Sequence, residues 1–219
     1  KYRILFVTGG SMVELNYIDA IKQRVAAAED GTLFIGSDFG DIASDDAVRK
    51  TLSRLVGAGE LERPLRGIFR KPGFNAFLNE PTVAGPDEIA HAIARKFGWS
   101  IAPAGDTALN MLGMDTQVPT VFHYVSDGPY RAYEYSSFVL DFAHTANKEI
   151  SSLTETSSVV VQALKARGKD NVSNADLRRI AERLDERQLK NLLDETKTTT
   201  VWIRETVKRI LSKKEIAHA

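Results

Sequence analysis

The segment SDDAVRKTLSRLVGAGELERPLRGIFRKP, residues 44–72, decides the fold of the first half of the chain. Its first part predicts a helix over about residues 45–56, because apolar residues recur three and four positions apart on one side. That stripe consists of Val48, Leu52, Leu55 and Val56. Ser44 is the predicted N-cap, and Asp45 and Asp46 suit the positive end of the helix dipole. Glycines follow directly and end the helix.

The rest of the segment predicts a basic hairpin. Residues 60–63 and 67–70 are short β-prone runs, and residues 64–67 supply the proline and glycine of a turn between them. Arginines flank this turn on both sides.

Upstream of the segment, apolar periodicity predicts a helix over residues 13–28. A short β-prone run follows at 32–35, and a brief helical turn at 37–43. Helix, short strand, short helix, capped helix and basic hairpin is the order of a winged helix-turn-helix. We therefore predict that fold for residues 12–78.

From the winged-helix fold we can predict which residues of the chain contact DNA. The outer face of its second long helix enters the major groove, and arginines on the hairpin reach the neighbouring backbone or minor groove. The predicted contact residues are Arg49, Lys50, Ser53 and Arg54 on the helix, and Arg63, Arg66, Arg70 and Lys71 in the hairpin. Asp45 and Asp46 are interpreted as caps, although either also suits a hydrogen bond from a cytosine amino group. Winged helices also dock proteins, so a protein-interaction module without sequence-specific DNA binding is the alternative.

Charge is unevenly distributed along the chain, although the formal net charge is zero. Residues 47–75 contain seven basic residues and two acids, whereas residues 79–168 contain six basic residues and ten acids. This asymmetry predicts that the first part of the chain meets phosphate and the second part does not.

Two stretches of the chain resemble a known family. Residues 44–72 match the pattern aL.rL...G.l.r..rGiy..P, with Phe69 where the family often has tyrosine. The second match is PAGDTALNMLGM at residues 103–114, followed by TQVP at residues 116–119. Together, within about residues 20–145, these stretches resemble the AbiEi-type antitoxins of type IV toxin–antitoxin systems.

The resemblance implies a function for both halves. The first domain is expected to bind double-stranded DNA in its own promoter, at inverted repeats, and to repress its own transcription. The second domain is expected to act as an antitoxin against a co-encoded nucleotidyltransferase-type toxin. That toxin is a functional partner, which the antitoxin need not contact.

The second half predicts an α+β domain over residues 86–219, after a linker at residues 72–85 that is rich in turn formers. Three aromatic, β-prone runs within residues 121–142 predict a small antiparallel sheet whose aromatics form core. Helical periodicity returns from Thr154 to the C-terminus. The predicted fold class is α+β, a winged helix followed by a mixed α/β domain with this sheet and C-terminal helices.

Catalytic patterns are weak in this sequence. The chain has no cysteine, and its histidines lack the spacing of metal ligands. His144 and Asp141 are close in sequence, a pairing that is common by chance. The run Thr8-Gly9-Gly10-Ser11 lacks both the dinucleotide-binding spacing and the lysine of a phosphate loop. We therefore predict no enzymatic activity, no cofactor and no metal site.

The remaining sequence features concern the cellular compartment of the protein. No apolar run is long enough to span a membrane, and the first residues lack the features of a signal peptide. With no cysteine to form disulfides, the chain is predicted to be cytoplasmic, without a membrane partner. Residues 1–11 are interpreted as a linker or upstream tail, with Met12 as a natural start.

Overall fold

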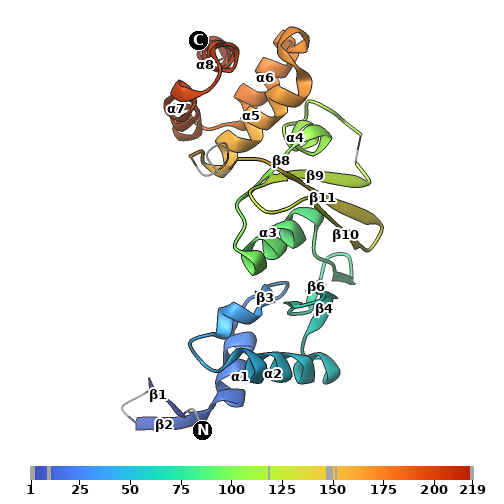
Figure 1. Cartoon of the computed structure of the whole chain (residues 1–219), viewed down its shortest axis with the longest axis vertical. Coiled ribbons are helices and arrows are strands. Elements are labelled where there is room, and N and C mark those ends of the chain that lie inside the picture. Colours follow the sequence, from blue (N-terminus) through green and yellow to red (C-terminus); the bar gives the residue numbers. More distant parts are fainter. Residues whose placement is uncertain (1–2, 9–10, 118, 147–149, 151, 218–219) are drawn as a thin grey trace. The chain divides into compact units, whose positions relative to one another are not determined.

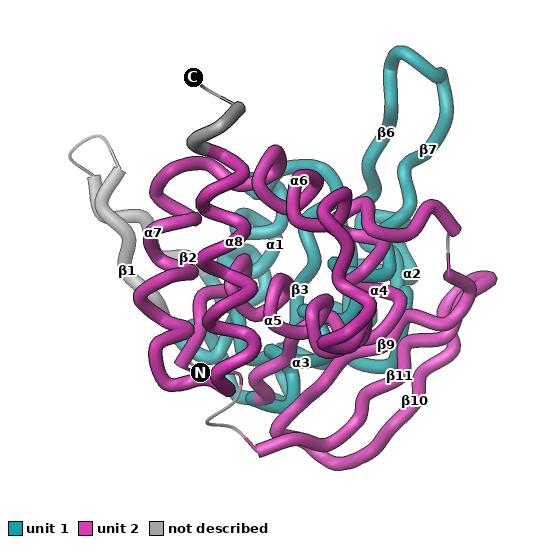
Figure 2. Tube along the Cα trace, turned by 90° about the horizontal axis from the view of Figure 1, so that it is seen from above, with its two compact units in different colours: residues 1–98 teal, residues 99–219 magenta. Residues whose placement is uncertain are grey.

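The structure, a computed structural model, describes residues 3–8, 11–117, 119–146, 150 and 152–217 (Figure 1). It divides into two compact units, Lys1–Gly98 and Trp99–Ala219 (Figure 2). The described residues form eight α-helices and several small sheets, and both units contain helices and strands. The predicted α+β fold class is therefore confirmed.

The N-terminal unit is built from short elements around a three-stranded sheet. In chain order they are β1 (Arg3–Thr8), β2 (Ser11–Asn16), α1 (Tyr17–Ala27), β3 (Leu33–Ile35), the 3₁₀ turn η1 (Gly36–Phe39), α2 (Asp45–Gly57), β4 (Glu62–Leu65), β5 (Ile68–Arg70), β6 (Gly73–Asn75), β7 (Glu80–Thr82) and α3 (Pro86–Phe97). The sheet has the order β3-β5-β4, and both of its pairings are antiparallel. Strands β1 and β2 pair with each other in an antiparallel manner, and β6 and β7 form a separate hairpin.

One apolar core holds α1 and α2 against this sheet. Ile21 of α1, Leu52 of α2 and Phe69 of β5 are almost completely buried in the same cluster. Burying side chains of this size contributes roughly 1.5–3 kcal/mol each, which fixes which face of α2 points inward. The helical spacing in residues 45–56 thus predicts the inner side of α2 correctly.

The predicted start of the first helix needs correction. The helix predicted over residues 13–28 starts at Tyr17, because the Asn16 side chain caps it by accepting hydrogen bonds from the backbone of Ile18 (2.9 Å) and Asp19 (3.0 Å). The preceding residues 11–16 pair with β1 instead. Of the glycine run at residues 8–11, positions 9 and 10 lie outside the described residues.

The division between the units also differs from the predicted boundary at residues 78–86. Helix α3 belongs to the N-terminal unit, which ends at Gly98. Helix α3 contacts β3 and β5, and its Arg95 donates to the backbone oxygen of Leu33 (2.9 Å) and pairs with Asp38 (3.5 Å). The turn-forming residues 72–85, predicted as a linker, contain the β6–β7 hairpin.

The C-terminal unit joins a sheet to a group of helices. Its elements are β8 (Ile101–Pro103), α4 (Gly105–Met111), β9 (Val121–Ser126), β10 (Arg131–Tyr135), β11 (Phe138–His144), α5 (Glu155–Arg167), η3 (Lys169–Asn171), α6 (Asn174–Arg183), α7 (Glu186–Glu195), η4 (Thr196–Thr198) and α8 (Val201–Ala217). Figure 1 shows α5, α6, α7 and α8 lying together, which confirms the predicted C-terminal helices. None of the helices among the described residues has both the length and the apolar character needed to cross a bilayer.

The sheet of this unit is mixed rather than antiparallel as predicted. Its order is β10-β11-β9-β8, and β11 runs parallel to β9 while the other pairs are antiparallel. The apolar strand β11 takes an inner position because Leu140 and Phe142 are completely buried there, whereas β10 lies at the edge and is largely exposed. The prediction that aromatics form core is confirmed for Tyr124 and Phe142, whose rings stack with centroids 5.4 Å apart.

Candidate nucleic-acid interface

Helix α2 has an apolar inner side and a basic outer side. Its buried residues are Val48, Thr51, Leu52 and Leu55. The predicted contact residues Arg49, Lys50, Ser53 and Arg54 are all exposed. The packing of the inner side therefore holds this basic face toward solvent.

Asp46, in the first turn of α2, organises two of these cations. Its Oδ1 accepts a hydrogen bond from Arg49 Nη2 (2.5 Å), and its Oδ2 pairs with Lys50 Nζ (2.7 Å). Lys50, and to a smaller extent Arg49, holds the pKa of the Asp46 carboxyl below its ordinary value. Ser44 lies at the N-cap position but makes no side-chain cap hydrogen bond. Because exposed ion pairs are weak and exchange with other partners, Arg49 and Lys50 stay available to a phosphate.

The hairpin of β4 and β5 carries two further exposed arginines. The Arg63 guanidinium lies over the ring of Phe69, 5.6 Å from its centroid, so a buried aromatic of the core positions it. Arg66 lies in the turn, beside Gly67, whose backbone has a φ of +78°. Glycine is the residue that adopts this left-handed conformation at little cost, and it keeps the turn tight.

A groove of about 420 Å³ connects the helix to the hairpin. It is lined by Arg49 of α2, Arg63 and Arg66 of the hairpin, and Lys96 at the end of α3. Lys96 was not among the predicted contact residues, although its Nζ donates to the backbone oxygen of Arg66 at 2.5 Å. Asp45 is the one acid among the lining residues of this groove. Four cations from three elements thus converge on one surface, which we call the basic groove.

Arg70 does not belong to this surface, contrary to the prediction. Only 3% of it is exposed, and Nη1 donates to Glu62 Oε2 (3.1 Å) and to the backbone oxygen of Thr82 (2.7 Å). Its Nη2 donates to Thr82 Oγ1 (2.7 Å). These bonds tie β5 to β4 and to β7, so Arg70 has a structural role and cannot reach a phosphate in this conformation.

Lys71 is also held away from the hairpin tip. Its Nζ donates to the backbone oxygens of Ala26 (3.0 Å) and Ala28 (2.7 Å), and pairs with Asp30 (3.2 Å). The carbonyls at the C-terminal end of α1 have no partners within the helix, and a lysine there satisfies them and suits the helix dipole. Lys71 therefore caps α1.

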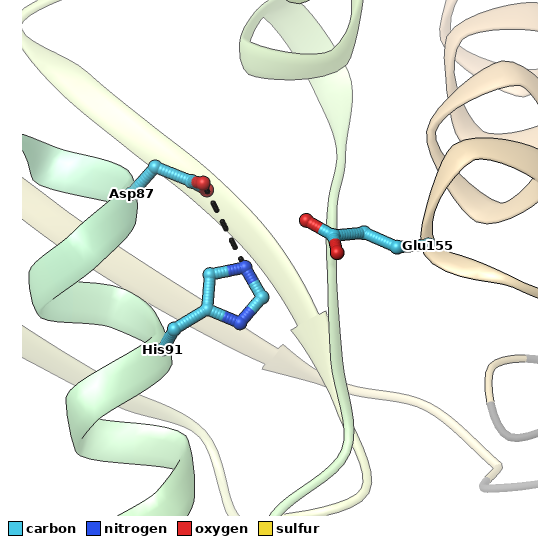
Figure 3. A group of neighbouring side chains, drawn as sticks. All are labelled: Asp87, His91 and Glu155. Carbon is cyan, nitrogen blue, oxygen red and sulfur yellow. Dashed lines mark ion pairs between the residues drawn. The ribbon is translucent and has the colours of Figure 1, made fainter.

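The histidines of the described residues have separate partners. His91 pairs with Asp87 one turn earlier in α3, with 3.7 Å between Nε2 and Oδ2 (Figure 3). Asp141 pairs with His123 across the sheet at 3.2 Å rather than with His144. The Nδ1 of His144 contacts the backbone oxygen of Gly128 at 2.9 Å. The sequence neighbours His144 and Asp141 thus do not form the pair considered above.

Comparisons with known proteins cover most of the chain. Residues 20–192 match the model of DUF6088, described as a family of unknown function. No curated protein matches the sequence. The chain is similar to the crystal structure of the RV2827C protein from Mycobacterium tuberculosis, with 12% sequence identity and a TM-score of 0.41, over 97% of this chain and 82% of that one. The family match thus includes parts of both units.

Proposed function

The chain belongs to the DUF6088 family, and we propose that its N-terminal unit is a winged helix-turn-helix that binds double-stranded DNA. The order α1, β3, η1, α2, β4, β5 supports this proposal, as does the sheet order β3-β5-β4. In that fold, α2 is the recognition helix and the β4–β5 hairpin is the wing. The observation that carries the proposal is the basic groove, because it joins the exposed face of α2 to the wing with cations from both.

The proposed contact surface has two parts with different roles. Arg49, Lys50, Ser53 and Arg54 enter the major groove, where an arginine forms a bidentate pair with guanine. Arg63 and Arg66 contact phosphates beside that groove, which positions the helix. Lys96 is a third proposed phosphate contact. Arg70 and Lys71 are excluded from the contact surface because their side chains form bonds within the N-terminal unit. Asp46 keeps Arg49 and Lys50 extended over the helix surface before DNA arrives.

A binding titration tests this proposal. A duplex from the region upstream of the chain's own gene is titrated with the full chain, and fluorescence anisotropy is measured at several salt concentrations. If the three cations assigned to the backbone, Arg63, Arg66 and Lys96, meet phosphates, the logarithm of affinity falls with the logarithm of salt with a slope of about −3.

Charge-reversal variants test whether the exposed face of α2 is the surface that binds DNA. The double variant Arg49→Glu/Arg54→Glu should lower affinity at least about 100-fold, since it both removes contacts and repels phosphate. The matched control is Arg178→Glu/Arg187→Glu, which changes the net charge equally at two exposed residues of the C-terminal unit. No binding at low salt, or equal losses in both variants, would contradict the proposal. A specific protein partner bound through the same face would favour the protein-interaction alternative.

The resemblance to AbiEi-type antitoxins supports a wider proposal. The chain would repress its own promoter at inverted repeats and neutralise a co-encoded nucleotidyltransferase-type toxin without binding it. We assign the neutralising activity to the C-terminal unit. The test is to co-express the full chain with the neighbouring gene. Arg49→Glu/Arg54→Glu should abolish repression of a promoter reporter while still rescuing growth, and failure of the wild-type chain to rescue growth would refute the antitoxin role alone.

A further inference from the structure

The β6–β7 hairpin exposes apolar side chains to an unusual degree. Phe77 is 95% exposed and Val83 82%, and Phe74 and Leu78 are each more than half exposed. Figure 2 shows both strands extending from the rest of the N-terminal unit. Single exposed apolar residues are common on soluble proteins, but a group of them on one projecting element marks an interaction site. We call Phe74, Phe77 and Leu78 the apolar tip; Val83 follows β7 at the base of the hairpin and is not part of it.

The apolar tip is held in a defined conformation. The side chain of Asn75 accepts hydrogen bonds from the backbone of Phe77 (3.0 Å) and Leu78 (3.1 Å), which fixes the turn. At the base, the buried Arg70 bonds to both the backbone and the hydroxyl of Thr82. A rigid surface loses little conformational entropy on binding, so this arrangement favours a specific partner.

The charge of the hairpin argues against nucleic acid as that partner. Residues 72–85 contain no lysine or arginine, and Glu80 is their one charged residue. Binding to DNA or RNA draws much of its affinity from cations that meet phosphates. The composition of the hairpin therefore favours a protein surface over nucleic acid as a partner.

We propose that this partner is a second copy of the chain, with the two hairpins meeting around a two-fold axis. Among the described strands, β6 and β7 pair only with each other. A hairpin whose outer edges are free of other described strands, and whose surface is apolar, is complementary to itself, as an isologous dimer requires. Pro81 has no N–H and makes β7 the weaker edge, so β6 is the edge expected to pair with its counterpart.

The area available fits a weak dimer. With roughly 150–250 Å² for each phenylalanine, the three partly exposed side chains present on the order of 400 Å² in each copy. Two copies then bury about 800 Å², which is below the range for stable interfaces and fits a weak, transient contact. Such a dimer forms without DNA, and it would also present two α2 helices to an inverted repeat.

Sedimentation equilibrium of the full chain, without DNA, measures this self-association. The wild-type chain should show a concentration-dependent mass between monomer and dimer, and Phe77→Ser/Leu78→Ser should weaken association about 30-fold or more. Both residues are exposed, so the variant is expected to fold, which circular dichroism checks. The control Tyr130→Ser removes an aromatic residue that is 75% exposed in the C-terminal unit and should leave association unchanged.

Cysteine cross-linking then locates the interface, because the chain has no cysteine of its own. Ala76→Cys, beside the apolar tip, should form a disulfide-linked dimer on mild oxidation. Ala58→Cys, an exposed position after α2, should not. A wild-type chain that stays monomeric, or equal cross-linking at both positions, would overturn the proposal. The proposal would also be overturned if the chain is monomeric and Phe77→Ser/Leu78→Ser lowers its affinity for DNA. The tip would then act as a wedge in the minor groove.

Discussion

Two consecutive β-hairpins of the N-terminal unit have similar backbone structures but opposite surface chemistry, since one is basic and the other is apolar. The β4–β5 hairpin turns at Arg66 and Gly67 and borders the basic groove. The β6–β7 hairpin turns at Phe77 and Leu78 and exposes the apolar tip. Short strands fix where each turn lies, but the turn residues determine the surface chemistry that it presents. The first hairpin suits phosphate, and the second suits a partner that removes apolar surface from water.

Arg70 links the two hairpins, and its removal should have the largest effect on stability. Arg70→Ala breaks bonds to Glu62 and Thr82 and removes this donor from the part-buried carbonyl of Thr82. We expect the free energy of unfolding to fall by about 3 kcal/mol, measured by urea denaturation. The control Arg66→Ala, at an exposed position, should stay within about 0.5 kcal/mol of wild type. An Arg70→Ala variant with full stability and lost DNA affinity would instead support a direct role in binding.

The exposed arginines of the first hairpin should affect binding and not stability. Arg63→Ala/Arg66→Ala is expected to lower DNA affinity about 10- to 30-fold and to reduce the magnitude of the salt slope by about 2. Anisotropy titrations at several salt concentrations measure both. Phe77→Ser/Leu78→Ser is the matched change in the second hairpin, and a duplex with a single half-site should bind it as tightly as wild type. Equal losses in both variants would remove the distinction between the hairpins.

Local patterns predicted the elements that matter most for these hairpins. The spacing of Val48, Leu52 and Leu55 gives both the position of α2 and its buried side. The proline and glycine between residues 64 and 67 give the first turn. Both signals are local, because helical periodicity and turn chemistry depend on neighbours in the sequence.

The roles of individual cations were harder to predict. Arg66 and Arg70 look alike in the sequence, yet Arg70 is buried because Thr82, in the next hairpin, meets it. The sequence carried no clear signal of this, because Glu62 lies opposite Arg70 only through a shift of the strand register between Glu62 and Leu65. Lys96 is the converse case, since only the packing of α3 brings it to the basic groove.

Two other errors also have long-range causes. Residues 11–16 have apolar residues compatible with a helix, but they pair with β1 and leave Asn16 to cap α1. The sheet of the C-terminal unit is mixed because β11 lies between β10 and β9. A hairpin turn predicts that neighbours in sequence are antiparallel, but it does not predict which strand pairs with a third.

Gly73 begins the second hairpin and Gly67 lies in the turn of the first. Replacing each with alanine should lower the free energy of unfolding, but for different physical reasons. At Gly73 a Cβ would lie 2.4 Å from Thr82 Oγ1, so Gly73→Ala should cost about 2 kcal/mol through overpacking. At Gly67 the cost is the φ of +78°, about 1 kcal/mol. The control Gly57→Ala has no atom within 4 Å of the added Cβ and ends α2, so it should be neutral or slightly stabilising. Urea denaturation measures all three, and equal costs at Gly67 and Gly73 would contradict the assigned causes.

The smallest expected effect separates the shape of the second hairpin from its apolar surface. Asn75→Ala removes the side chain that fixes the turn but leaves Phe77 and Leu78 in place. Global stability should change by less than about 1 kcal/mol, because the turn is exposed. Self-association should still weaken several-fold, since the free tip now samples conformations that a partner must order. The same sedimentation measurement checks this, with Glu80→Gln, at an exposed position of β7, as the control in the hairpin. If Asn75→Ala associates like wild type, apolar area alone drives the contact, and the rigidity of the hairpin contributes nothing to it.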